Sequence, residues 1–248
     1  MKFCVCIKQV PDVSAPIQVR DGEIVMDAGR VVLNAYDASA VEAALVLTAE
    51  HGGTVDVILI GPEKAAEAIR KALAMGADSG EHLVSSGDEL DSAAVSKLLA
   101  EAVQGRQFDV ILTGKQSQDS DAGLTGGMLA ERLGVPYATN AVGLEIENDQ
   151  VIVTRQGDSG QEVLALPTPC LVTCSNDMND PRIPNLKGIM AAKKKQIASS
   201  ALSETPGPKA RMLRYESIPG RQAGEVLEGD PPEMAATLVA RLSAANAL

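Results

Sequence analysis

Short apolar runs alternate with amphipathic stripes through the first half of the chain. The runs that favour buried strands are rich in β-branched residues, and they are 3–7, 54–60, 82–85 and 110–112. Apolar residues recur at helical spacing in the stretches between them, which are 37–51, 62–74, 91–104 and 125–133. The order β-α-β-α-β-α-β-α, with connections long enough for right-handed crossovers, predicts helices packed on a mostly parallel sheet.

This rhythm changes after Val135-Pro136. Three short strands, 142–147, 151–155 and 162–166, are separated by turn residues, which predicts a small antiparallel meander. The apolar run 170–174 is expected to return to the main sheet. A separate hairpin is predicted within 17–26, where Asp21-Gly22 supplies the turn.

The last third of the chain is irregular. Two prolines and a glycine interrupt 176–190, where we expect no regular element, and a long Pro-, Gly- and Ser-bearing segment follows before an amphipathic helix at 233–244. So long a stretch without periodicity is poorly explained inside a compact monomer. We therefore expect a domain at 1–198 and an arm at 199–248 that lies on another subunit; a disordered tail is the alternative.

The formal net charge of −11 disfavours nucleic-acid binding and association with anionic membranes. Hydrophobic residues make up 45% of the chain but aromatic residues only 2%, so the core must be aliphatic. The chain begins Met-Lys-Phe and enters a predicted strand at once, and its apolar runs are too short to span a membrane. We expect a soluble, cytoplasmic protein without a signal or transit peptide.

Cysteine and histidine usage argues against a metal site. Cys4 and Cys6, and likewise Cys170 and Cys174, are spaced so that each pair lies on one face of a strand. Neither pair has the spacing of a zinc knuckle, and the chain has 2 histidines. The cysteines are expected to be structural, in a reducing compartment.

A polar loop, 114–125, follows the strand at 110–112 and precedes a helix. Open α/β sheets bind ligands at such a place, and the free N–H groups of a helix start suit a phosphate. Asp119 and Asp121 would repel a polyphosphate unless a metal or Lys115 intervened; they could instead accept hydrogen bonds from ribose or cap the helix. A capped solvent loop is the alternative. The chain contains neither GxGxxG nor GxxxxGK[ST].

Several stretches together resemble one protein family: CVCIKQVPD, LNAYDASAVEAAL, IRKALAMGAD, GKQSQDSDAGLTGGMLAERLGVPYAT and NDPRIPNLKGIMAAKKK. In this order, and over nearly the whole chain, they resemble the β subunit of electron-transfer flavoproteins. The resemblance implies a three-layer, Rossmann-like α/β fold of the adenine-nucleotide α-hydrolase type. It also implies a non-enzymatic electron carrier, paired with an α subunit that holds the redox FAD.

In the commoner branch of that family the β subunit buries an AMP with a structural role. The resemblance places its pocket here at Cys6, Asn34, Ala35, Tyr36, Asp37, Ile60, Gly114, Lys115, Gln116, Asp119, Asp121, Gly123, Leu124 and Thr125. Amides near Gly123 and Thr125 would hold one phosphate, which tolerates the two aspartates better than a triphosphate would. Cys6 and Ile60 would be apolar walls.

The resemblance also implies a recognition loop at 176–192. Leu186 would anchor it in an apolar pocket of a partner dehydrogenase, such as an acyl-CoA dehydrogenase, with Ile183, Ile189 and Met190 around it. A membrane quinone oxidoreductase is the candidate final acceptor. The alternative is that Leu186 and Ile183 fold back on their own domain. The basic run 193–195 would be a solvated face or a contact with the partner or the α subunit.

Two residues depart from the family pattern. Leu124 stands where a glutamine is usual, and Gln156 stands where many members carry an acid, which puts in doubt a salt bridge to the α subunit's flavin domain. Three other functions are alternatives. A bifurcating branch of the same family would hold a second FAD in place of AMP. A stand-alone nucleotide-binding or ATP-hydrolysing protein would need a glycine or serine loop for a pyrophosphate and a base near the phosphate, and this sequence shows neither. A nicotinamide dehydrogenase would need the glycine fingerprint after its first strand and a proton-transfer histidine, which are also missing here.

Overall fold

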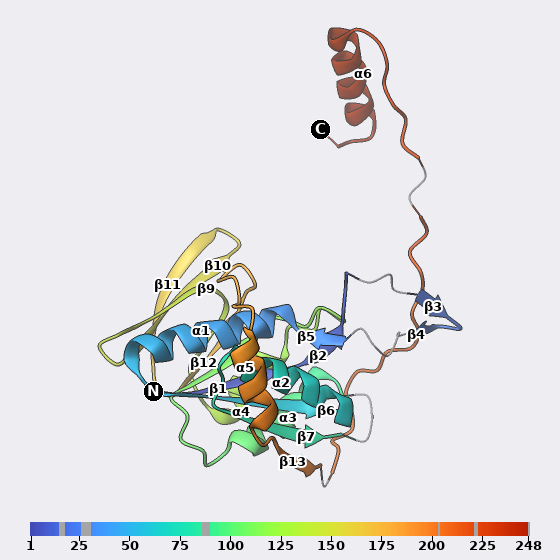
Figure 1. The fold of residues 1–248 in the computed structure, drawn as a ribbon. Coiled ribbons are helices and arrows are strands. Elements are labelled where there is room, and N and C mark those ends of the chain that lie inside the picture. Colours follow the sequence, from blue (N-terminus) through green and yellow to red (C-terminus); the bar gives the residue numbers. More distant parts are fainter. Residues whose placement is uncertain (15–17, 26–30, 86–89, 203, 221–222, 248) are drawn as a thin grey trace. The chain divides into compact units, whose positions relative to one another are not determined.

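The computed structural model of the chain describes residues 1–14, 18–25, 31–85, 90–202, 204–220 and 223–247. The chain divides into two compact units, Met1–Tyr215 and Glu216–Leu248. The first unit is a three-layer, Rossmann-like α/β fold, as predicted. Figure 1 shows its sheet crossing between layers of helices.

The main sheet of the described residues has nine strands in the order β11-β10-β9-β12-β8-β1-β6-β7-β13. Strand β1, inside the sheet, pairs in parallel with β6 on one side and with β8 on the other. The strands are β1 (Lys2–Ile7), β6 (Thr54–Gly61), β7 (Ser79–Val84), β8 (Val110–Gly114), β9 (Tyr137–Glu147), β10 (Gln150–Gly157), β11 (Gly160–Pro167), β12 (Cys170–Cys174) and β13 (Ala198–Ala201).

The helices of the first unit cover both faces of this sheet (Figure 1). They are α1 (Ala35–His51), α2 (Ala66–Met75, preceded by a 3-10 turn at Glu63–Ala65), α3 (Ser92–Val103), α4 (Thr125–Leu133) and α5 (Leu186–Lys194). The predicted alternation of strands and helices through α4 is therefore confirmed. Gly134, which follows α4 in the left-handed conformation, is the expected helix stop.

Successive residues of the buried strands face opposite layers. Phe3, Val5 and Ile7 of β1 pack with α1 and α2 in one apolar cluster. Cys4 and Cys6 pack with α3 and α4 in the other. This alternation is the period of two of a strand buried on both faces, and it makes the three layers.

The four cysteines are free and buried. Cys170 and Cys174 lie in the layer of α1 and α2, on the opposite face of the sheet from the other pair. Burial raises the pKa of the Cys170 thiol to about 12, so this thiol stays protonated near neutral pH. The predicted structural role fits both observations.

The antiparallel meander is confirmed, but it extends the main sheet. β9 begins at Tyr137, five positions before the expected start at 142, because its first residues pair in parallel with β12. The strand 170–174 returns to the main sheet as predicted and lies between β9 and β8. The predicted hairpin is also present, as β3 (Gln18–Arg20) and β4 (Glu23–Val25); residues 17 and 26 lie outside the described residues.

The expectation that 176–190 holds no regular element was wrong in its last five residues. Helix α5 begins at Leu186, because the side chain of Asn185 accepts a hydrogen bond from Gly188 N at 2.8 Å. Tertiary packing then holds the helix, since Ala192 is buried against the α1–α2 layer. Three strands were not expected: β13 is the edge partner of β7, and β2 (Gln9–Pro11) pairs with β5 (Val31–Leu33).

The second unit contains the predicted closing helix, α6 (Pro231–Ala244), which has no buried residue. An ion pair between Arg241 and Glu225 joins the helix to the segment before it. Leu238 and Val239 remain about half exposed. Within the described residues, no helix is long and apolar enough to cross a membrane.

Candidate functional site

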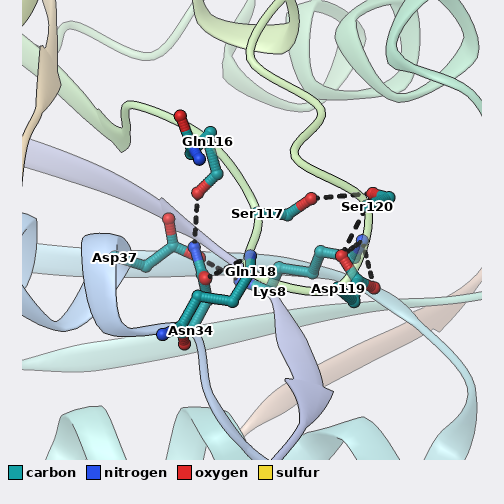
Figure 2. A network of polar contacts seen from close by, with 8 residues as sticks. All are labelled: Lys8, Asn34, Asp37, Gln116, Ser117, Gln118, Asp119 and Ser120. Carbon is teal, nitrogen blue, oxygen red and sulfur yellow. Dashed lines mark hydrogen bonds and ion pairs between the residues drawn. The ribbon is translucent and has the colours of Figure 1, made fainter. Parts of the chain in front are cut away.

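Asn34 ties the start of α1 to the loop 114–125. Its side-chain amide donates to Gln116 O at 2.9 Å and accepts from Gln118 N at 3.1 Å (Figure 2). In return, the side chain of Gln118 accepts a hydrogen bond from Ala35 N at 3.1 Å. The loop thus caps an otherwise unpaired N–H group of the helix, and Asn34 is used to fix the loop rather than to cap its own helix.

Asp37 joins the ends of two strands beneath the loop. Its carboxylate accepts hydrogen bonds from Lys8 N at 2.7 Å and from Gly114 N at 2.9 Å. A Cβ on Gly114 would lie 2.3 Å from an Asp37 oxygen, so only glycine fits at the end of β8. Burial raises the pKa of Asp37 to about 7, against the hydrogen bonds from Lys8, Asn34 and Gly114, which lower it.

This raised pKa predicts a pH-dependent stability. The folded protein binds a proton at Asp37 more tightly than the unfolded chain does. The contribution of this proton to the free energy of unfolding is therefore complete below about pH 4. It is lost as pH rises through about 7. Unfolding of the heterodimer, measured at pH values from 5 to about 8, should show a decline that Asp37→Asn flattens. The control Asp158→Asn, in an exposed turn, should keep the wild-type slope; equal slopes in both variants would contradict the assignment.

Lys8, directly after β1, neutralises one of the two loop aspartates. Its ammonium lies 2.8 and 2.7 Å from the carboxylate oxygens of Asp119, and Ser120 Oγ donates to the same carboxylate at 3.1 Å (Figure 2). Burial alone would raise the pKa of Asp119, but Lys8 and the hydroxyls of Ser117 and Ser120 hold it below its ordinary value. Lys8, rather than Lys115, therefore reduces the repulsion of a phosphate that the sequence predicts for Asp119.

The other aspartate, Asp121, shapes the loop. Its φ of 50° is in the left-handed region, and its carboxylate accepts from the Gln116 side chain at 2.8 Å. Lys115 donates its backbone N–H to Cys174 O at 2.8 Å, which fixes the loop to β12. Within the described part of the chain, the ammonium of Lys115 has no hydrogen-bond or ion-pair partner, so it is available to an anion.

Helix α4 begins at Thr125, where the loop ends, and its first turn contains two glycines. A Cβ on Gly126 would lie 2.5 Å from Thr173 Cγ2 and 2.8 Å from Thr113 Oγ1. This glycine therefore lets the helix start press against the ends of β8 and β12. The N–H groups of the first turn have no intrahelical partner, and together with the helix dipole they make an anion-binding position.

The remaining predicted site residues are divided between the two faces of the sheet. Cys6 and Ile60 lie in the apolar layer of α3 and α4. Tyr36 is half-buried beside Gly114. A Cβ added to Gly114 would lie 2.7 Å from the Cβ of Tyr36. Leu124 is 65% exposed. A cavity of about 520 Å³ lies beside α4, lined among others by Gly123, Leu124, Gly127, Met128, Tyr137 and Thr139.

A second cavity, of about 300 Å³, lies at the opposite edge of the sheet. It is lined by the amino-terminal ends of β6 and β7, with Arg106 and Glu81 among its residues. The two side chains form an ion pair with each other. Because ligands of open α/β sheets bind at the carboxyl ends of the strands, the loop 114–125 is the better candidate site. The described residues contain no group of three metal-ligating side chains.

The first half of the predicted recognition loop, 176–192, is held by α1. Arg182 donates to the carboxylate of Glu42 through N, Nε and Nη2, at 3.0, 2.7 and 2.8 Å. The Glu42 side chain is 10% exposed and that of Arg182 is 44% exposed, so only the carboxylate half of this clamp is shielded from water. Next to it, Asn179 Nδ2 donates to Ser39 O at 3.0 Å. Helix α1 therefore holds the loop 114–125 at its start and Arg182 of the segment 176–192 further along.

The segment that follows this clamp exposes four apolar side chains. The exposed fractions of Ile183, Leu186 and Met190 are 90%, 76% and 52%, and that of Ile189 is 40%. These four residues are here called the docking patch. Ile183 and Leu186 do not fold back onto their own domain in this structure, which was the alternative for these two residues. The opposite side of α5 packs on α2, where a Cβ on Gly188 would lie 2.6 Å from Ala74 O.

Sequence reasoning missed Lys8, Gln118, Glu42 and Arg182 as members of these two sites. Lys8 carried a usable signal, because it directly follows a predicted parallel strand whose carboxyl end meets the ligand edge. The Glu42–Arg182 contact joins residues 140 positions apart, for which a single sequence offers no local sign. Gln156, which replaces a family acid, is exposed on β10, and its carbonyl accepts from Asn140 Nδ2 at 2.7 Å.

The parallel sheet and the polar loop at its carboxyl edge define a Rossmann-like α/β protein with a candidate ligand position at that edge. The model of the electron transfer flavoprotein domain matches residues 23–205, and the chain belongs to this family. It is 37% identical over 243 residues to the electron transfer flavoprotein subunit beta of Syntrophomonas wolfei, covering 97% of this chain and 94% of that protein.

Two further relatives show the range of the family. The subunit beta of Bradyrhizobium diazoefficiens is 38% identical over 231 residues, covering 90% of this chain and 92% of that protein. The caffeyl-CoA reductase-Etf complex subunit CarD of Acetobacterium woodii is 35% identical over 260 residues, covering 98% of each. The chain is thus an electron-carrier subunit rather than an enzyme, and the name β subunit implies a heterodimer with an α subunit.

Proposed function

We propose that this chain holds one AMP as a structural ligand in the loop 114–125, while the redox FAD is held mainly by the α subunit. The start of α4, glycine-lined and pressed against β8 and β12, supports this most strongly, because its N–H groups suit a single phosphate. The pairing of Asp119 with Lys8 reduces the repulsion that such a phosphate would meet.

The docking patch completes the proposal. Held by the Glu42–Arg182 clamp, Leu186 enters an apolar pocket of a partner dehydrogenase, such as an acyl-CoA dehydrogenase, and electrons pass through the FAD of the α subunit. A membrane quinone oxidoreductase would accept them. Burial of one leucine contributes about 1.5–3 kcal/mol, which positions a partner without trapping it. The arm expected at 199–248, apart from its first residues in β13, packs on the α subunit, which then covers the exposed apolar residues of α6.

A second candidate places another FAD in the loop instead of AMP. It is kept because CarD, named as a subunit of a caffeyl-CoA reductase complex, is similar to this chain over nearly its whole length. Mass spectrometry of the denatured heterodimer separates the two: one FAD with one AMP supports our proposal, and two FAD without AMP supports the second candidate. A heterodimer with neither an AMP nor a second FAD would contradict both.

Asp121→Ala combined with Thr125→Val should lower the AMP content of the purified heterodimer. The first change removes the partner of Gln116 that shapes the loop, and the second removes a hydroxyl at the start of α4. We expect a loss of about 2 kcal/mol, or roughly thirtyfold in AMP affinity. The control Asp158→Ala should retain AMP. Full AMP occupancy in the double variant would show that the loop is not the nucleotide site.

A further inference from the structure

The start of α3 holds a distant part of the chain through one side chain. Asp91 is the N-cap residue of this helix, and its Oδ1 accepts a hydrogen bond from Ala94 N at 2.8 Å. Its Oδ2 accepts hydrogen bonds from Lys209 N at 2.6 Å and from Ala210 N at 2.9 Å, across 118 and 119 positions of the chain. These N–H groups, that of Ala94 first, hold the pKa of Asp91 below its ordinary value, so the side chain is a carboxylate near neutral pH.

The segment held by Asp91 is fixed to the first unit at two further points. Before it, Leu202 N donates to Val84 O at 3.0 Å, and Leu202 packs in the layer of α3 and α4. After it, Tyr215 N donates at 2.8 Å to Gly22 O, in the turn of the hairpin β3–β4. Tyr215 is also the last residue of the first unit. Residues 209–215, here called the strap, therefore lie along the first unit up to the point at which the second unit begins.

The order of the strap does not come from burial. Residues 204–215 form neither helix nor strand, and Met212 and Leu213 are 48% and 85% exposed. Fixing such a segment costs conformational entropy, and exposed side chains offset little of that cost. Pro206 and Pro208 restrict the chain just before the strap, which lowers the cost. The hydrogen bonds at the two ends of the strap therefore decide whether it is ordered.

The helix cap and the strap use different oxygens of Asp91. An N-cap needs one acceptor oxygen, which asparagine also supplies. The second carboxylate oxygen is the acceptor for both N–H groups of the strap, and an ionised acceptor makes the stronger hydrogen bond. An asparagine would instead place an NH2 donor against those two N–H groups. A single substitution therefore separates the strap contact from the cap.

We propose that Asp91 is a positioning residue for assembly: it orders the strap before the α subunit binds, so that the arm leaves this chain from a fixed point. This inference rests on the proposed packing of the arm on the α subunit. Entropy lost within this chain is not lost again on association, and such preordering strengthens a complex without a new contact to the partner. The apolar side chains of the strap, Met212 and Leu213, are then held outward for that surface.

The first test is the susceptibility of the strap to trypsin in the FAD-containing heterodimer. Trypsin cleaves after lysine, so the bond between Lys209 and Ala210 reports release of the strap. Asp91→Asn should raise the rate of cleavage there at least about tenfold, with flavin content and helix content unchanged because the cap of α3 is kept. The control Asp158→Asn makes the same change in charge in an exposed turn and should be cleaved at the wild-type rate. Wild-type cleavage of Asp91→Asn would overturn the inference.

The second test is the dissociation constant of the heterodimer, measured by dilution with mass photometry. Asp91→Asn should raise this constant about tenfold. Ala210→Pro removes one N–H donor of the strap and leaves the cap of α3 untouched, so it should act in the same direction. The two substitutions together should have no larger effect than the stronger one alone, because both break the same contact. Additive effects would show that Asp91 does not act through the strap.

Leu213→Ser with Ile218→Ser tests the packing of the arm itself. These side chains are 85% and 93% exposed in this chain, so the pair should raise the dissociation constant without faster cleavage after Lys209. If this pair raises the constant and Asp91→Asn does not, the arm packs on the α subunit as proposed but Asp91 does not position it. If neither raises the constant, the arm does not contribute to the heterodimer, and both proposals are wrong. Faster cleavage of Asp91→Asn with an unchanged constant would make the strap contact purely structural and overturn the inference.

Discussion

Gly126→Ala should destabilise the protein by about 1–3 kcal/mol and lower its nucleotide content. The new methyl group would lie 2.5 Å from Thr173 Cγ2 and 2.8 Å from Thr113 Oγ1, so the start of α4 must lift away from the sheet. That movement would carry the N–H groups of the first helical turn away from the phosphate position. Chemical unfolding of the heterodimer, and nucleotide analysis after denaturation, measure the two effects.

The neighbouring Gly127 is a matched control. A Cβ there meets nothing closer than Tyr137 Cε2 at 3.7 Å, and alanine has the higher helix propensity. Gly127→Ala should therefore leave the stability unchanged or raise it by up to about 1 kcal/mol. Equal destabilisation by the two substitutions would mean that α4 does not contact β8 and β12 as described.

Leu186→Ala should reduce kcat/KM for electron transfer from a partner dehydrogenase by roughly thirtyfold. Removing the side chain beyond Cβ forfeits about 2 kcal/mol of apolar burial on docking. The stability and flavin content of the heterodimer should not change, because Leu186 is 76% exposed. Steady-state reduction kinetics with the dehydrogenase and its acyl-CoA give the result.

Two further variants define what the docking patch requires. Val163→Ala removes an exposed apolar side chain from β11, at the sheet edge opposite β13, and should have no effect on transfer. Glu42→Gln leaves Leu186 intact but takes the charge from the clamp with Arg182, so it should raise KM more than it lowers kcat. An unaltered rate for Leu186→Ala would remove the anchor from the proposal, whatever the clamp variant does.

The strands, the helices through α4 and the position of the polar loop could be predicted because their signals are local. A buried strand such as 110–112 is a short run rich in β-branched residues, and a glycine that directly follows a helical stripe, as Gly134 does, predicts the end of that helix. The start of α5 was missed although Asn185 is an ordinary N-cap residue. Pro181, Pro184 and Gly188 made the segment read as irregular, and only packing against α2 shows why a glycine stands in the first turn.

The position of the candidate site was predictable, but its hydrogen bonds and ion pairs were not. The resemblance supplied the residues around 34–37 and 114–125, and the structure brings most of them together. The resemblance could not show that Lys8 pairs with Asp119, because 111 positions separate the two residues. Nor could the resemblance show that Asp37 is buried between Lys8 N and Gly114 N. This burial raises the pKa of Asp37 to about 7.

The sequence alone determined the layer order, the aliphatic core, the net negative charge and the family of this protein, since all of these are carried by composition, periodicity and ordered motifs. Only the tertiary structure decided how α1 serves both sites, which cations are used internally and which face outward, and why Gly114 and Gly126 must be glycine. These properties depend on distances between residues far apart in the chain, and such distances are set by packing rather than by any local pattern.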